Sequence, residues 1–544
     1  MRILPPSLLA VSLLCVSGAV PRLAHACGGF ACSLAQPVVQ TGERIVYFPH
    51  PESGSIDVII DIQYQGPSEE FAWLLPLPGV PLETWVGSPG VFSRFETATA
   101  PQVSVTRTLG PQCRESFGFN AESDSVATAG AAEGANRGGV TVHVQDQVGP
   151  YERAVISSDK VTDVEAWLLD NGYDIPGGML GLVHPYLQKG DVLLALRLKK
   201  DSSVGEIQPI HLRLPSTEAC IPLTLTAVAA VQDMDVFATI VTPQGRAIPQ
   251  NYYEVEPNWL KLDWLANGSN YQQLVGEAVD EATGHAFVTE SAMKNPPQLE
   301  NSLQVSFDTS ALNGATGIAT VLDRLGRAGL AGEPGVGAIL VANAVEPALQ
   351  SRLAELGDSF LGCPTCFSGT LRGLGSLNPK YVDELRERIV EPLSRTAALY
   401  ADANRADEAW VTRLHTVLSP EEMTLDPIFD YRNDLPEVSN VLRANVTQHC
   451  SFGGGLSGKV TIEAEVAGQT FTIQSESGLD ALPSAMRARS LASAEISTLF
   501  DNRDAITSEL SADGCRCARP RAQPSLLAFG LVGLGFFALR RRRR

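Results

Sequence analysis

The sequence predicts an α+β fold: a sheet-rich N-terminal domain at 27–295, a helix-rich region at 296–450, and a short hairpin plus helix at 451–512. Two patterns of apolar residues predict this order. Apolar and polar residues alternate with a period of two through much of 27–295 and again in 459–474, which is typical of half-buried strands. Apolar residues recur at helical spacing through much of 296–450. A sorting tail at 513–544, with a single transmembrane helix, completes the prediction.

Strands are predicted where this alternation is bounded by turn residues. Arg44–Phe48 and Ile56–Gln65 flank the turn-forming stretch Pro51-Glu52-Ser53-Gly54, so we expect two strands joined by a loop. Phe71–Leu77 is an apolar run that ends at prolines, which indicates a buried strand. The remaining strand predictions of this domain are Val140–Val148, Glu152–Ile156, Val192–Leu198 and Leu223–Val231.

Helices are predicted from apolar spacing and from end signals. A helix begins at Val161, with Ser158 or Asp159 as its N-cap, and stops at Asn171-Gly172. Ser419-Pro420-Glu421-Glu422 has the pattern of a capping box with proline at the first helical position. Further helical spacing occurs in Ile318–Leu325, Ala338–Leu356 and Pro379–Val417, and Ser484–Leu510 favours helix.

The N-terminus has the features of a secretory signal peptide, residues 1–26. Arg2 is followed by the apolar segment Leu8–Val16, and Ala24-His25-Ala26 offers a small-x-small cleavage site after Ala26. An uncleaved N-terminal anchor is the alternative. A lipoprotein that begins at Cys27 is disfavoured, because His25 fits a lipobox poorly.

The C-terminus combines a Cys motif, Gly514–Cys517, with the apolar run 525–539 and the arginines Arg540–Arg544. Fifteen helical residues reach about 22 Å, which is marginal against a hydrocarbon layer of about 30 Å. The arginines would remain cytoplasmic by the positive-inside rule. The tail resembles the MYXO-CTERM sorting signal of exported proteins, which implies removal of the helix by a sorting protease and lipidation at Cys515. An uncleaved single-pass anchor is the alternative.

The composition is that of a folded, acidic protein. Hydrophobic residues make up 44% of the 544 residues and charged residues 19%, which indicates a real core. There are 41 basic and 61 acidic residues, for a net charge of −20. Such a chain repels phosphates and anionic head groups, so we predict no nucleic-acid partner. Solubility explains the charge, with weak Ca²⁺ attraction as an alternative.

Cysteines of an exported chain are expected to form disulfides, because they meet an oxidising compartment. Proximity pairs Cys27 with Cys32 and Cys363 with Cys366, and Cys113 with Cys220 would then close a long loop. Cys450 is left over, either as a free thiol or paired with a tail cysteine.

Local motifs indicate no catalytic or metal-binding residue and no cofactor. Gly453–Val460 matches a phosphate-binding loop up to Lys459, but Val460 stands where a Ser or Thr must hold Mg²⁺, so we predict no nucleotide site. No histidine stands in a zinc-protease spacing. The Cys363–Cys366 pair has the spacing of a redox motif, although a structural disulfide is favoured because the strand–helix setting is missing.

Several motifs together resemble a bacterial family called domain of unknown function 2330. That family has no assigned activity, so the resemblance implies an exported or surface-bound envelope protein and no catalytic residues. We therefore predict a non-enzymatic, anchored protein that binds a ligand or serves a structural role, with signal peptidase and a sorting protease as partners. An extracytoplasmic thiol–disulfide exchanger or hydrolase is the alternative. The motifs are Cys27–Cys32, Tyr64–Gly66 with Phe71–Pro78, Trp167-Leu168 with Asn171–Tyr173, Ala278–Ala282 with Val288–Glu290, and Leu418–Met423 with Asp426-Pro427.

Overall fold

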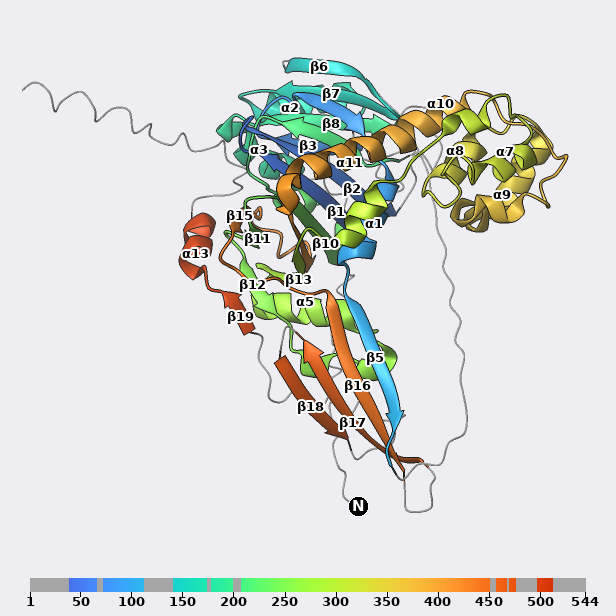
Figure 1. Ribbon diagram of the computed structural model, residues 1–544. Coiled ribbons are helices and arrows are strands. Elements are labelled where there is room, and N and C mark those ends of the chain that lie inside the picture. The colour runs from blue at the N-terminus through green and yellow to red at the C-terminus, as the bar shows by residue number, and fades with distance from the viewer. Residues whose placement is uncertain are drawn as a thin grey trace, which may run out of the picture.

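The protein has a mixed α+β fold with a sheet-rich N-terminal region, as the sequence predicts. Sheets and helices are stacked in layers, and a small sheet and a helical lobe project from them (Figure 1). This computed structural model describes residues 39–65, 72–111, 140–173, 178–198, 207–450, 456–466, 469–475 and 497–511.

A nine-stranded sheet, which we call the large sheet, forms the centre of the fold. Strand β1 pairs with β2 antiparallel and with β10 parallel, and β14 joins β10 to β13. In order across the sheet, the strands are β19 (Ser497–Phe500), β12 (Tyr253–Glu256), β13 (Ala286–Lys294), β14 (Trp410–Leu418), β10 (Ala230–Thr242), β1 (Val39–His50), β2 (Ser55–Gln65), β9 (Ile210–Leu214) and β4 (Glu83–Val86).

A second, antiparallel sheet covers one face of the large sheet. It contains β3 (Ala72–Leu77), β8 (Val192–Leu198), β7 (Tyr151–Ser157) and β6 (Thr141–Val148). The alternation of these strands places Leu194 and Leu196 in the core between the two sheets, while Leu193 and Ala195 face outward. Helices α2 (Val161–Asp170) and α3 (Met179–Lys189) bury that outer face.

The opposite face of the large sheet is covered by α1 (Pro89–Thr99), α6 (Pro297–Leu303) and α11 (Glu391–Ala403). Helix α1 begins where Ser88 caps it, because the Ser88 hydroxyl accepts a hydrogen bond from the backbone N–H of Gly90 at 3.3 Å. Phe92 and Phe95 of its buried face pack with Phe48 of β1. The result is a four-layer arrangement of helix, sheet, sheet and helix.

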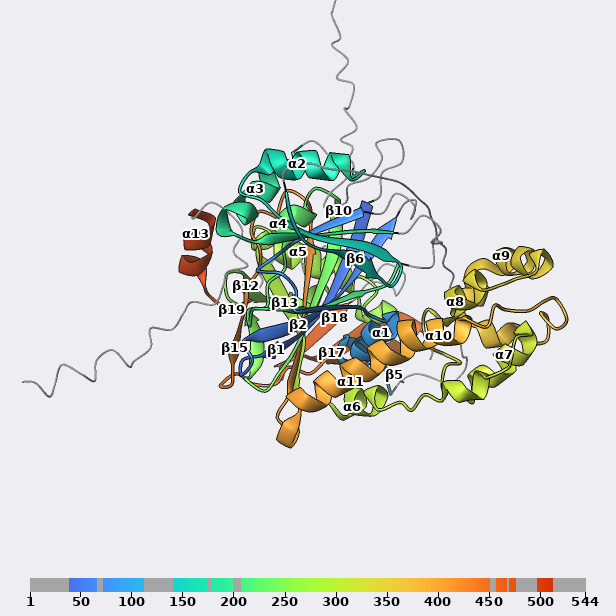
Figure 2. The ribbon, with the colours of Figure 1, turned by 90° about the horizontal axis from the view of Figure 1, so that it is seen from above.

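The core between the large sheet and helices α1, α6 and α11 continues into a helical lobe, which lies to one side of the sheets in the view from above (Figure 2). It contains α7 (Ile318–Leu325), α8 (Val336–Ala342), α9 (Pro347–Gly362) and α10 (Tyr381–Leu385). A π-helical turn, Arg386–Val390, joins α10 to α11. Short 3₁₀ helices lie at Trp259–Lys261, Trp264–Ala266, Thr309–Leu312, Pro364–Phe367 and Arg405–Asp407.

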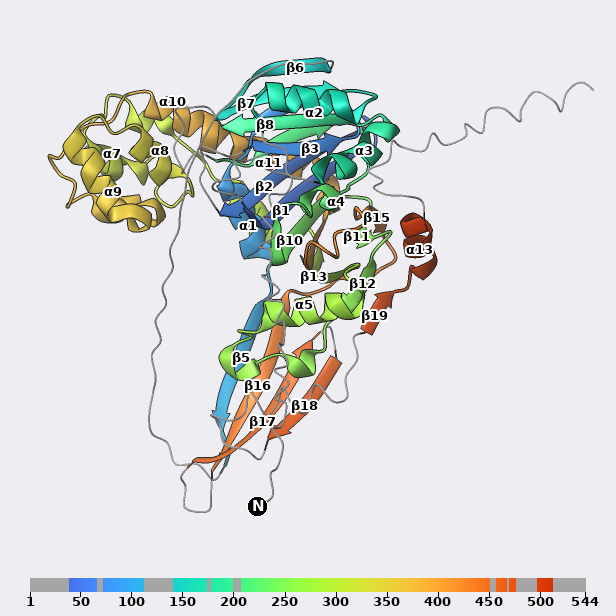
Figure 3. The same cartoon turned by 180° about the vertical axis from the view of Figure 1, so that it is seen from behind.

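A four-stranded sheet, which we call the distal sheet, lies below α5 (Tyr271–Glu281) in Figure 3. Its strands are β18 (Gln469–Ser475), β17 (Leu456–Val466), β16 (Val441–Cys450) and β5 (Gln102–Leu109), and β5 pairs with β16 in parallel. Alternate residues of β16 and β17 form a core with Trp264 and Leu274. A two-stranded sheet joins β11 (Arg246–Pro249) to β15 (Phe429–Arg432).

Most predicted strands are confirmed, and the helix that begins at Val161 is confirmed. Its predicted cap is wrong, because Lys160 is the N-cap and makes no side-chain capping bond. The described part of the glycine-rich stretch, from Leu456 on, is the start of strand β17.

Several predictions within the described residues are wrong in whole or in part. Ser497–Phe500, inside the predicted helix Ser484–Leu510, forms strand β19, because it pairs with β12. The predicted helix Ala338–Leu356 is two helices, since α8 ends at Ala342 and α9 begins at Pro347. Trp410–Leu418 forms strand β14, not the end of a helix, because hydrogen-bonded neighbours occupy both of its edges. Leu223–Thr226 forms the short helix α4 instead of a strand, since the Asp426 carboxylate accepts the Thr224 N–H at 2.9 Å and satisfies its first turn. The Ser419 capping box closes a turn only, with the Ser419 N–H donating to Glu422 at 2.8 Å.

The predicted signal peptide, 1–26, and the sorting tail, 513–544, lie outside the described residues. Among the helices that are described, none is long and apolar enough to cross a membrane. The predicted span at 525–539 is not part of that set.

Candidate ligand pocket between the large and distal sheets

The main candidate site is a pocket of ≈ 580 Å³ that lies where the large sheet meets the distal sheet. We call it the junction pocket. Its walls include Val255, Val288, Leu442, Val466 and Leu499, so much of the lining is apolar. Its lining comes from Pro101, from β11, β12, β13, the Pro257–Trp259 turn, α5, the segment 435–439, β16, β17 and β19. This volume and lining are typical of a site for a small ligand.

A buried ion pair lies at the wall formed by β11, β12 and β13. The Arg246 guanidinium donates to the Glu254 carboxylate, which also accepts from the Thr289 hydroxyl. The same guanidinium donates to the Pro436 carbonyl at 3.3 Å and so ties the segment 435–439 to the sheet. Arg246 is 4% exposed, and its Nε donor has no acceptor among the described residues. The wall therefore keeps one hydrogen-bond donor unused.

Glu290 brings a second buried charge to the pocket, because a β-bulge in the pairing of β13 with β14 turns it out of the ladder. Its carboxylate accepts from Arg413 Nε at 2.5 Å and lies 2.7 Å from His415 Nδ1. Burial alone would raise the pKa of Glu290, but the charges of His415 and Arg413 outweigh it and lower the pKa to about 2.

His415 connects this carboxylate to a second one. Its Nε2 lies 2.8 Å from Asp235 Oδ1, while its ring stacks on Phe237 with centroids 4.2 Å apart. Burial disfavours the imidazolium, but Glu290 and Asp235 outweigh burial and raise the pKa of His415. Both ring nitrogens face carboxylate oxygens, so this arrangement favours the imidazolium form, in which each nitrogen can donate.

Two aromatic residues line the pocket at its rim. The rings of Trp259 and Tyr271 stack with centroids 6.3 Å apart and an angle of 21° between their planes. The Trp259 indole donates to Glu256 at 2.8 Å, which fixes the edge of the ring. The position of Trp259 is set locally: the Asn258 side chain accepts from the Leu260 N–H at 3.1 Å and caps the 3₁₀ helix that begins at Trp259.

Glu290 is poorly suited to proton transfer. A carboxyl that acts as general acid needs a raised pKa, and a good general base needs one near the working pH. The pKa of Glu290 is lowered instead, so this carboxylate is a weak base at neutral pH. No cluster of three His, Cys, Asp or Glu side chains in the described ranges is arranged to hold a metal ion.

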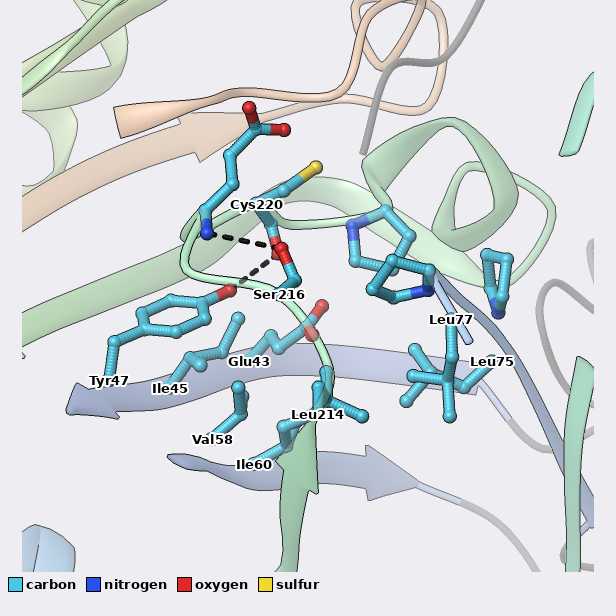
Figure 4. Close-up of a pocket in the computed structure, with 14 residues that line it drawn as sticks. Glu43, Ile45, Tyr47, Val58, Ile60, Leu75, Leu77, Leu214, Ser216 and Cys220 are labelled. Atoms are coloured by element: carbon cyan, nitrogen blue, oxygen red, sulfur yellow. Dashed lines mark hydrogen bonds between the residues drawn. The ribbon is translucent and has the colours of Figure 1, made fainter. Parts of the chain in front are cut away.

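A smaller pocket of ≈ 40 Å³ lies between the two stacked sheets (Figure 4). Apolar side chains such as Ile45, Val58 and Leu214 surround Glu43, whose carboxylate accepts from Gln40 at 3.1 Å. Burial raises the pKa of Glu43 to about 7, and the bond from Gln40 offsets only part of this effect. The volume suits a few water molecules, so this pocket is no ligand site.

Buried polar residues also cluster at the other edge of the large sheet. Asp57 lies 2.7 Å from His211 Nε2 and 2.8 Å from His50 Nε2, and it accepts from Arg213 at 3.0 Å. Burial alone would raise the pKa of Asp57, but these bonds outweigh it and hold the pKa well below its usual range. The arrangement joins β1, β2 and β9 and needs no ligand to balance it.

The predicted cysteines are not in the junction pocket. Cys363 and Cys366 form a disulfide in the helical lobe, as predicted. Cys220 is disulfide-bonded, and so is Cys450, which excludes a free thiol at Cys450. Predicted sites at Ala26, Cys27, Cys32, Cys113 and Cys515 lie outside the described residues.

Sequence reasoning did not single out the residues of the pocket, although Thr289 and Glu290 belong to one of the motifs used for the family resemblance. Arg246 and Glu254 carry no local signal beyond a strand pattern, and Trp259 is one of six tryptophans that could stack on a sugar but that a hydrophobic core explains as well. Their role emerges only when the sheets bring them together.

The fold and pocket define a layered α+β protein with a site of ligand size. The chain belongs to the family described as an uncharacterized protein conserved in bacteria (DUF2330), whose model matches residues 21–426. No curated protein and no solved structure matches the chain. The wall residues Arg246, Glu254 and Glu290 lie inside the matched segment, whereas the segment 435–439 and strands β16 and β17 follow it.

Proposed function

We propose that this protein is an exported, membrane- or surface-anchored envelope protein that binds a ligand in the junction pocket and catalyses no reaction. The observation that carries the proposal is the ≈ 580 Å³ pocket, with apolar walls, an aromatic pair and an unused donor of Arg246. A large apolar pocket with a few convergent polar groups is the usual form of a binding site. Export and anchoring are supported by the signal-peptide pattern and by the MYXO-CTERM-like tail.

The thiol–disulfide exchanger gains no support from its surroundings. Cys363 is the C-cap of α9, and its backbone N–H donates to the Ser359 carbonyl at 3.2 Å. It is also the N-cap of the four-residue 3₁₀ helix Pro364–Phe367, whose single turn carries a much smaller dipole than α9. The negative end of a helix disfavours a thiolate, whereas exchangers lower a thiol pKa at a helix N-terminus. Cys366 follows in a 3₁₀ turn and gains no such helix end. A structural disulfide is the better interpretation.

Methyl NMR on valine- and leucine-labelled protein tests the binding proposal, because Val255, Val288, Leu442 and Val466 report from inside the pocket. A mixed library of small molecules is screened against the natural chain and against Ser439→Trp, which fills the pocket from its rim. Asn433→Trp is the matched control, since Asn433 is exposed nearby and does not line the pocket. We expect compounds that shift these methyls in the natural chain and in Asn433→Trp but not in Ser439→Trp. Pocket methyls that respond to no compound would rule out the proposal.

Anchoring is tested separately by fractionation. A form truncated before Asp513 should leave the membrane fraction, and mass spectrometry of the mature C-terminus should find a trimmed end that carries a lipid on Cys515. A truncated form that still sediments with membranes would contradict retention by the tail.

A further inference from the structure

Some carboxylates that line the junction pocket have no cationic partner among the described residues. Glu254 is paired with Arg246, and Glu290 with Arg413 and His415. Three further carboxylates line the pocket: Glu256, Glu437 and Glu465. They share one further lining cation, Arg443, which faces Glu465 across the β16–β17 pair.

The two remaining carboxylates, Glu256 and Glu437, accept from neutral donors in the part of the chain that the structure describes. Glu256 accepts from the Trp259 indole at 2.8 Å, and Glu437 accepts from the backbone N–H of Lys294 at 2.9 Å. These bonds fix the positions of both carboxylates without neutralising them. A bound cation would therefore find preorganised partners, and the net charge of −20 attracts cations toward the protein in general.

The other lining groups specify what kind of cation fits. Trp259 and Tyr271 present aromatic rings, which attract organic ammonium and guanidinium groups. Val255, Val288 and Leu442 offer an apolar wall to a hydrocarbon stem. A metal ion would gain nothing from either surface.

The pocket also provides donors. Arg246 keeps an Nε that has no acceptor among the described residues, and the exposed Arg443, which lies opposite Glu465 across β16 and β17, also lines the pocket. These donors match an oxygen acceptor near the cationic group, such as a peptide carbonyl.

We propose that the junction pocket recognises a lysine- or arginine-bearing peptide segment, with the basic side chain against Glu256, Glu437 and Trp259 and the peptide oxygens toward the arginines. This inference rests on the proposed binding function and names its ligand class. A neutral sugar, which would also stack on Trp259, is the competing ligand that the test must separate.

The experiment compares matched probes by methyl NMR titration of the exported protein. Nα-acetyl-lysine methylamide carries the ammonium, and its Nε-acetylated counterpart differs by the loss of that charge. Cellobiose represents the neutral sugar. We expect the dissociation constant of the lysine probe, taken from the shifts of the pocket methyls, to be at least about tenfold lower than that of the acetylated probe. The affinity for the lysine probe should fall as the NaCl concentration is raised, because salt screens exposed charges.

Variants locate the effect. Glu256→Gln keeps an acceptor for the Trp259 indole but removes the charge, so it should lower the affinity for the lysine probe about fivefold. Adding Glu437→Gln should lower this affinity about fivefold again. Glu463→Gln is the control, because Glu463 is an exposed carboxylate on the same strand as Glu465 and does not line the pocket. It should change the affinity less than twofold.

The outcomes separate the two proposals. If cellobiose or the acetylated probe binds as well as the lysine probe, or if Glu256→Gln and Glu463→Gln behave alike, the cationic ligand class is wrong while the binding function stands. If no probe and no library compound shifts the pocket methyls, both proposals fall.

Discussion

The Glu290 cluster allows a quantitative test of the physical reasoning, by the substitution Glu290→Gln. The pKa of Glu290 is lowered from 4.5 to about 2. At about 1.4 kcal/mol for each pH unit, this difference corresponds to about 3 kcal/mol of folding free energy at neutral pH. A similar value follows from the chemistry, since the variant leaves Arg413 and His415 buried beside a neutral amide, and breaking a buried ion pair costs about 3–5 kcal/mol.

The sign of the pH dependence follows from the direction of each change. The stabilisation by Glu290 is complete above its ordinary pKa of 4.5 and is lost as the pH falls through about 2. The pKa of His415 is raised, so its contribution is complete below 6.5 and is lost as the pH rises through the folded value. The variant should therefore be about 3 kcal/mol less stable than the natural chain at pH 6, and this gap should narrow toward pH 2.

Urea unfolding followed by far-UV circular dichroism at several pH values measures this gap. The matched control is Glu355→Gln, which breaks an ion pair with Arg352 whose side chains are 65% and 38% exposed. An exposed pair of this kind contributes at most about 1 kcal/mol, so the control should unfold almost as the natural chain does. A Glu290→Gln variant as stable as the control at pH 6, or a gap that does not depend on pH, would refute the reasoning.

Three further predictions concern the core and one turn, and equilibrium unfolding checks each of them. Glu43→Gln should stabilise the protein by up to about 3 kcal/mol at pH 8 and leave its stability unchanged at pH 4. Burial raises the pKa of Glu43 to about 7, so the natural carboxyl lowers the stability of the fold only as the pH rises above 4.5. Equal effects of the substitution at both pH values would contradict this reasoning. Gly245→Ala should cost more than about 1 kcal/mol, since Gly245 has φ +133° and an added Cβ would lie 2.5 Å from the Arg432 carbonyl carbon; an unchanged midpoint would show that the turn relaxes. Phe95→Ala should cost about 3–5 kcal/mol because the ring is fully buried against Phe48, and a loss below about 1 kcal/mol would show that the core collapses around the cavity.

The strands were predictable wherever side-chain alternation records burial. Strand β8, Val192–Leu198, begins and ends at the predicted residues, because its two faces pack against different apolar layers. Helix α2 was predictable for a similar reason, since Val164, Trp167 and Leu168 form one buried stripe. Local pattern and tertiary environment agree in these elements.

Strand β14 shows where pattern reading fails. Trp410, Val411, Leu414 and Val417 recur at the spacing of a helix, so the apolar positions alone favour helix. The strand also buries Arg413 and His415, two polar residues that no helical pattern would place in a core. Their burial is possible only because Glu290 and Asp235 approach from neighbouring strands.

The pocket could not be predicted, because contacts between residues that are distant in the sequence build it. Residue pairing between β5 and β16 joins Val103 to Leu442, positions far apart in the chain, and this parallel ladder helps to build the distal sheet that closes the site. A bulge in β13 leaves Glu290 out of the ladder, so that Thr289 and Glu290 both line the pocket, although simple alternation would place these neighbours on opposite faces.

Buried charge and ligand site therefore have a common origin in this fold. The bulge that exposes one side of Glu290 to the pocket also lets its carboxylate reach Arg413 and His415, so the cluster fixes the pocket wall and holds it ionised. A wall fixed in this way presents polar groups that do not rearrange on binding, which lowers the cost of ordering them around a ligand. Glu256 and Glu437, by contrast, are bonded to neutral donors and keep their charge for a partner. Specificity for a cation would then depend on the rim, while the stability of the site depends on the wall.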